Sequence, residues 1–96
     1  MDLEFRKQNG ITLYIYKIHS NKYELEVLPE IKNSKSRFYT LSKEIEKIED
    51  AVENVYIYFK DKTFMQISFY YTFTFAADIY DNQNNQLDFF AYHEFS

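Results

Sequence analysis

Tyrosine side chains at alternate positions are the residues of this sequence best suited to hold a partner. Tyr14 and Tyr16 are two residues apart, and so are Tyr56 and Tyr58. In an extended strand this spacing puts both rings of a pair on the same side of the sheet. Tyrosine is enriched in protein interfaces because its ring buries a large area while its hydroxyl stays polar. We therefore predict a tyrosine-rich sheet face as the binding surface, with the candidate anchors Tyr14, Tyr16, Tyr56, Tyr58, Tyr70 and Tyr92.

Phe90, Thr72 and Thr74 share this face in the same prediction. An apolar patch of that width would be a liability for a monomer, which favours a partner. Two alternatives remain open. A strongly curled sheet would enclose the rings in a second core, and an ordinary solvated strand face would also carry tyrosine and threonine.

A group of carboxylates is the second candidate site. Glu46, Glu49 and Glu53 follow each other at intervals of three and four residues, which places them on one flank of a predicted helix. Together with Asp50, this acidic flank is suited to docking on a basic partner, and it could imitate the phosphates of a nucleic acid. The alternative is the ordinary solvated side of a surface helix.

The charge is unevenly distributed along the chain. Residues 1–48 contain nine Lys/Arg and seven Asp/Glu, a charge of +2, whereas residues 49–96 contain two and eight, a charge of −6. Nucleic-acid binding rests on neutralising phosphates, so the net charge of −4 argues against it, although the basic segment 32–37 leaves RNA as an alternative. A protein target with a basic surface, such as a nuclease or another nucleic-acid enzyme, fits this charge better.

Groups able to catalyse a reaction or bind a metal are few. The chain has no Cys and one Gly, which excludes thiol chemistry, thiolate zinc sites and glycine-rich phosphate loops. His19 and His93 have no nucleophile motif beside them. The polar segment 81–88 offers oxygen ligands, but a helix-loop-helix calcium site counted from Asp81 would need Gly at its sixth and Glu at its twelfth position, where Gln86 and Tyr92 stand instead. We expect no enzymatic activity, no cofactor and no metal.

The segment from Thr63 to Tyr80 organises the predicted fold. Its residues alternate so regularly that we predict a strand with one buried face, formed by the odd-numbered positions from Met65 to Ile79. Strands are usually about 3–10 residues long. We therefore expect this one to bend, to carry a bulge, or to split near Ala76 and Ala77.

Other strands are predicted at residues 3–7, 11–19, 23–28, 55–60 and 87–95, with a hairpin turn at Asn9-Gly10. A single helix is predicted over residues 41–54, because apolar side chains recur there at steps of four and three: Leu41, Ile45, Ile48, Val52 and Val55. The predicted fold is α+β in one domain of residues 1–96. It is a curved antiparallel β-sheet of about six strands packed on one α-helix, in the order strands–helix–strands.

These features predict a non-catalytic protein that inhibits or masks a protein partner. The alternatives are a small-molecule or nucleotide-binding module in the concavity of the sheet and a homodimer joined by its tyrosine faces. No apolar run reaches the roughly 20 residues that span a bilayer, so we expect a cytoplasmic location. The abundance of Lys, Asn and Ile is typical of AT-rich genomes, whose phages and mobile elements encode small acidic inhibitors such as anti-CRISPR and immunity proteins. That is an analogy of composition and not of motif.

Overall fold

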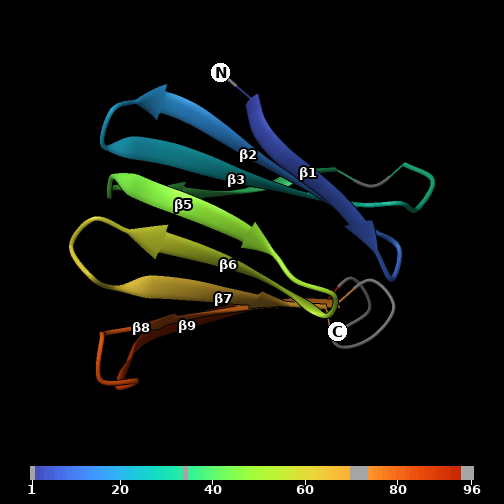
Figure 1. The fold of residues 1–96 in the computed structure, drawn as a ribbon. Coiled ribbons are helices and arrows are strands. Elements are labelled where there is room, and N and C mark those ends of the chain that lie inside the picture. Colours follow the sequence, from blue (N-terminus) through green and yellow to red (C-terminus); the bar gives the residue numbers. More distant parts are fainter. Residues whose placement is uncertain (1, 34, 70–73, 94–96) are drawn as a thin grey trace.

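The chain folds into two antiparallel β-sheets (Figure 1). The computed structural model describes residues 2–33, 35–69 and 74–93, and for residues 2–8, 92 and 93 it describes the backbone only. The N-terminal sheet consists of β1 (Asp2–Gln8), β2 (Ile11–His19), β3 (Lys22–Pro29) and β4 (Arg37–Leu41). The C-terminal sheet consists of β5 (Ile45–Asp50), β6 (Asn54–Phe59), β7 (Phe64–Ser68), β8 (Thr74–Tyr80) and β9 (Gln86–His93). Within each sheet, every strand pairs with its neighbours in the sequence.

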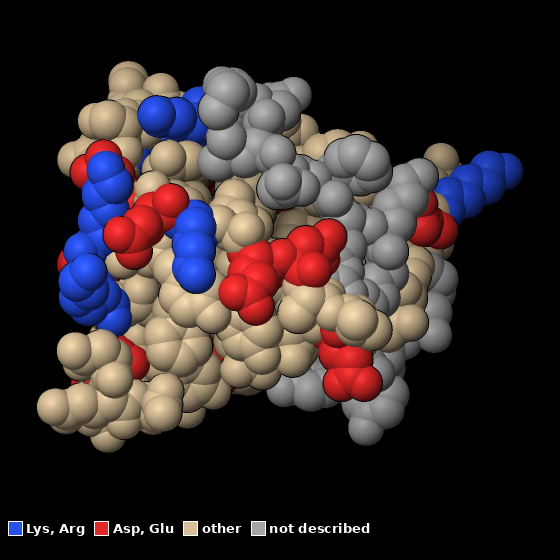
Figure 2. All heavy atoms as spheres, in the orientation of Figure 1, with Lys and Arg blue, Asp and Glu red and all other residues tan. Residues whose placement is uncertain are grey.

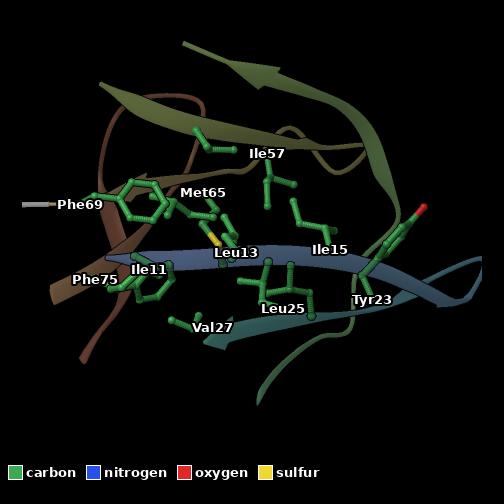
Figure 3. Close-up of a cluster of buried hydrophobic side chains, with 14 of the residues drawn as sticks. Ile11, Leu13, Ile15, Tyr23, Leu25, Val27, Ile57, Met65, Phe69 and Phe75 are labelled. Atoms are coloured by element: carbon green, nitrogen blue, oxygen red, sulfur yellow. The ribbon is translucent and has the colours of Figure 1, made fainter. Parts of the chain in front are cut away.

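The two sheets pack face to face over one hydrophobic core. Figure 3 shows Ile57 and Met65 of the C-terminal sheet meeting Leu13 and Leu25 of the N-terminal sheet. These four side chains are at most 1% exposed, and burying each of them fully contributes about 1.5–3 kcal/mol. The core draws on β2, β3, β4, β6, β7 and β8: Ile11, Leu13, Ile15, Tyr23, Leu25, Val27, Leu41, Val55, Ile57, Phe59, Met65, Ile67, Phe69, Phe75 and Ala77.

The predicted burial of the odd-numbered positions between Met65 and Ile79 is confirmed where the structure describes them. Met65, Ile67, Phe75 and Ala77 are inaccessible to solvent. Tyr71 and Phe73 lie outside the described residues. The partner that covers this face is the N-terminal sheet and not a helix.

The long alternating segment is a hairpin and not one strand. β7 ends at Ser68 and β8 begins at Thr74, so the split lies ahead of the predicted Ala76–Ala77 site, which is inside β8. Paired residues of an antiparallel ladder share a face. The β7–β8 register pairs Ser68 with Ala76 and Ile67 with Ala77, so odd-numbered residues face odd-numbered ones. The odd-numbered residues therefore share one face in both strands, which is why the sequence resembles a single strand.

The predicted helix over residues 41–54 is wrong, and so is the α+β fold class: the residues described form an all-β protein. Leu41 belongs to β4, Ile45 and Ile48 to β5, and Val55 to β6, and all four pack on the core. A shift of register between Ile45 and Lys47 adds one residue to β5, so that side chains three apart share a face. This β-bulge imitates helical spacing.

The remaining predicted strands are confirmed within the described residues, which leave out residues 94 and 95 of the last one. The described residues form nine strands where about six were expected. Asn9 and Gly10 have φ angles of 51° and 79°. The predicted hairpin turn is therefore confirmed, because an Asn-Gly turn of this kind needs positive φ at both residues. None of the described residues forms a helix long and apolar enough to cross a membrane.

Candidate protein-binding surface

The structure divides the predicted tyrosine face between two opposite sides of the molecule. Tyr14 and Tyr16 lie on the outer face of the N-terminal sheet, and Tyr56 and Tyr58 lie on the outer face of the C-terminal sheet. Because the inner faces are packed together, the two outer faces point away from each other. The prediction of one shared face is therefore wrong, since it assumed a single sheet covered by a helix.

Among the other members of the predicted face, the structure describes the side chains of Phe90, which is half-buried, and Thr74, which is 7% exposed. Phe90 is on the inner side, where its ring stacks on Tyr39 at 4.4 Å between ring centroids. The reason is the β8–β9 register, which pairs the buried Ala77 with Phe90 and so puts Phe90 on the inner face. Tyr70 and Thr72 lie outside the described residues, as does the side chain of Tyr92.

The outer face of the N-terminal sheet satisfies its own polar groups. Glutamates of β3 stand opposite the tyrosines of β2: Glu26 pairs with Tyr14, and Glu24 pairs with Tyr16. The Tyr16 hydroxyl donates to Glu26 Oε1 at 2.7 Å, and the Ser36 hydroxyl donates to Glu26 Oε2 at 2.5 Å. A partner would have to compete with these hydrogen bonds, so this face is the weaker candidate.

The outer face of the C-terminal sheet carries a continuous row of rings. Tyr58, Phe64 and Tyr80 are paired across β6, β7 and β8, with ring centroids 5.9 Å and 5.3 Å apart. Tyr56 extends the row along β6, 6.3 Å from Tyr58. We call these four half-buried residues the aromatic row. Contacts of this kind contribute about 0.5–1.5 kcal/mol each beyond area burial, which makes the row a firm surface.

A polar row lies beside the aromatic row. The register aligns Tyr56 with Gln66 on β7 and Gln66 with Asp78 on β8. Asp78 Oδ1 accepts a hydrogen bond from Gln86 Nε2 at 3.2 Å, and burial raises the pKa of the Asp78 carboxyl above its ordinary value. Next to Asp78 on β9 stands Phe89, 53% exposed. The face thus combines apolar area with a few polar groups.

The predicted acidic flank belongs to an edge strand and the turn after it. Glu46 lies at the β5 bulge, Glu49 pairs with Tyr56, and Glu53 lies in the bend before β6. All three are exposed. Figure 2 shows acidic side chains near the middle of the visible face, where β5 ends in Figure 1, and most of the basic ones at the left, where further acidic side chains lie among them. The structure therefore brings Glu49 to the aromatic row, while Glu46 and Glu53 flank it.

Lys47 is a member of this surface that the sequence analysis missed. It pairs with Tyr58 across β5 and β6, and its Nζ lies 4.8 Å from the centroid of the Tyr58 ring. Burial, with a smaller contribution from the charge of Glu49, raises the pKa of the Tyr58 hydroxyl. Phe64 and Tyr80 were missed as well, although both belong to the even-numbered set of the alternating segment.

The charge of the two halves of the chain follows the two sheets. Residues 1–41, which end with β4, contain seven Lys/Arg and five Asp/Glu, a charge of +2. Residues 42–96 contain four and ten, a charge of −6. The negative potential therefore accompanies the sheet that carries the aromatic row.

The other candidate groups do not converge. Across the described residues, no group of three or more His, Cys, Asp or Glu side chains is arranged to hold a metal ion. Asp81, the first residue of the polar segment, accepts backbone hydrogen bonds from Gln83 and Asn85, which hold the turn and lower the pKa of its carboxyl. The inner faces, where a ligand in the concavity would lie, are filled by the core.

No protein-family model matches this chain, and no curated protein or solved structure is significantly similar to it.

Proposed function

We propose that this chain is a non-catalytic protein that binds a protein partner through the outer face of its C-terminal sheet and thereby inhibits or masks that partner. The observation that carries the proposal is the aromatic row, Tyr56, Tyr58, Phe64 and Tyr80, on a solvent-facing sheet surface. Buried aromatic anchors supply most of the binding energy in many interfaces. A row already stacked in place needs little ordering on binding, which lowers the entropic cost.

The charge of this half of the chain supports a basic partner surface. An acidic field raises the rate of encounter with a basic protein more than it raises the final affinity. Nucleases and other nucleic-acid enzymes present such basic surfaces, and we propose a partner of that class, met in the cytoplasm. Inhibitors of phages and mobile elements, such as anti-CRISPR and immunity proteins, are the functional analogy.

The experiment is affinity capture from a host lysate, followed by binding measurements with the purified partner. Tyr58→Ala removes a ring of the aromatic row, and Tyr14→Ala is its matched control because it removes a ring stacked 5.9 Å from Tyr16 on the opposite face. We expect Tyr58→Ala to weaken binding at least tenfold and Tyr14→Ala to leave it within twofold. Both variants are compared below their thermal midpoints. Equal binding by the wild type and Tyr58→Ala would refute the proposal.

A further inference from the structure

We propose that Glu49 and Tyr56 form the seat for one arginine side chain of the partner. This inference rests on the proposed function and adds the chemistry of a single contact. It starts from two neighbouring cross-strand pairs on the outer face of β5 and β6. Lys47 pairs with Tyr58, and Glu49 pairs with Tyr56.

The first pair shows that a ring of this row receives a cation. The Lys47 ammonium lies 4.8 Å from the Tyr58 centroid, well within the roughly 6 Å that a cation–π contact requires. The chain therefore supplies its own cation to one of the two tyrosines of β6.

The second pair repeats this cross-strand register with the charge reversed. Glu49 occupies the position beside Tyr56 that Lys47 occupies beside Tyr58. Lys47 and Glu49 are exposed, and β5 is an edge strand of the C-terminal sheet. A partner can therefore approach them from the side of β5 that pairs with no described strand. Within the described part of the chain, the salt bridges are Lys43–Asp61 and Lys60–Glu44, and neither involves Glu49. The ring and the carboxylate are thus cross-strand neighbours, and no salt bridge between described residues neutralises Glu49.

Arginine is the side chain that uses both groups at once. Its guanidinium is planar and stacks on an aromatic ring while its N–H groups donate to a carboxylate. A lysine ammonium is a compact, strongly hydrated charge and gains less from the combination. Of the charged residues near the seat, Glu46 and Lys47 precede Glu49 on β5, and Asp50 and Glu53 follow it. Three carboxylates thus stand against one ammonium, and the local balance favours an incoming cation.

The position of Glu49 distinguishes the seat from a general acidic field. Glu53 carries the same charge only four residues away, but it lies in the bend and has no ring paired with it. Glu53→Gln is therefore a matched control for Glu49→Gln. Tyr56→Leu removes the ring while keeping apolar volume, and Tyr56→Phe keeps the ring.

The test is calorimetric titration of the whole protein with a nona-arginine peptide and, separately, with nona-lysine, at low and at physiological salt. We expect nona-arginine to bind more tightly. Glu49→Gln and Tyr56→Leu should each weaken it by about two- to fivefold more than Glu53→Gln, whereas Tyr56→Phe should match the wild type. Equal losses from Glu49→Gln and Glu53→Gln would show a diffuse charge effect and overturn the seat, as would equal binding of the two peptides.

The same variants, measured against the captured partner, separate the two proposals. If the partner's affinity falls with Tyr58→Ala but not with Glu49→Gln or Tyr56→Leu, the seat is refuted while the proposed function stands. If no partner depends on the aromatic row but nona-arginine still depends on Glu49 and Tyr56, the seat is supported and the proposed function fails.

Discussion

Val52 and Val55 provide a direct test of the fold, because they are the same residue type in two different environments. The apolar stripe of the predicted helix includes Val52 and, just past residue 54, Val55, and would give the two side chains similar weight. In the structure, Val55 is 3% exposed at the start of β6, whereas Val52 is 91% exposed in the bend before it. We therefore compare Val55→Ala with Val52→Ala.

The expected magnitude follows from the atoms removed. Valine to alanine deletes two methyl-sized groups, each worth about 0.8 kcal/mol when buried. Because the surrounding core relaxes only in part, a cavity penalty adds to this, and we expect Val55→Ala to lower the free energy of unfolding by about 2 kcal/mol. For a chain of this length that corresponds to a fall of roughly 10 °C in thermal midpoint. Val52→Ala should stay within about 0.5 kcal/mol of the wild type.

The assay is urea denaturation followed by far-ultraviolet circular dichroism, with the midpoint and the slope m determined for each variant. An unchanged m confirms that both variants unfold from the same structure. Comparable losses at the two positions would refute the assignment of this segment to two strands and a bend, and would restore the helix.

Three further predictions concern single residues. Gly10→Ala should destabilise the protein by about 1–2 kcal/mol in the same denaturation assay, because Gly10 has a φ of 79° where a Cβ is penalised; a neutral result would contradict the turn. Hydrogen bonds from Thr63, with a further one from Lys43, lower the pKa of Asp61 from 3.8 to about 2, so its stabilising contribution is complete above pH 4 and is lost as the pH falls through about 2. Between pH 4 and about pH 2, the free energy of unfolding of Asp61→Asn should therefore fall less than that of the wild type. Equal falls in the two proteins over this pH range would refute the prediction. Burial raises the pKa of the Asp78 carboxyl, so its ionised form opposes folding above that pKa. Asp78→Asn should therefore raise the thermal midpoint at pH 7, and the gain should shrink as the pH approaches 4. A lower midpoint for Asp78→Asn at pH 7 would contradict this prediction.

The sequence allowed the buried side of most strands to be predicted, because alternation reports directly which residues face the core. Met65, Ile67 and Phe75 were assigned to the inside on that basis alone. Two features of the ladder were hidden. Odd-numbered residues face the core in both β7 and β8, so the two strands resemble one. The β5 bulge puts Ile45 and Ile48, three residues apart, on the same face, so this strand resembles a helix.

The candidate site was predicted in its parts but not in its arrangement. The β6 tyrosines lie on an outer sheet face, whereas Glu49 was assigned to the flank of a helix; without that helix, Glu49 is the cross-strand neighbour of Tyr56. Tyr14 and Tyr16 moved to the opposite side because a second sheet, and not a helix, covers the first. Residue types alone do not say which strands share a sheet, so Lys47 and Tyr80 could not be joined to the surface before the register was known.

The pairing of every strand with its sequence neighbour also bears on how the chain reaches this structure. Ladders between adjacent segments close short loops, which limits the entropy lost before each contact forms and favours fast folding. Each hairpin can assemble as soon as its second strand has left the ribosome, without waiting for the C-terminus. The packing of the two sheets requires most of the chain to be present. It includes the hydrogen bond that the side-chain amide of Asn9 donates to the backbone carbonyl of Phe69, 60 residues away.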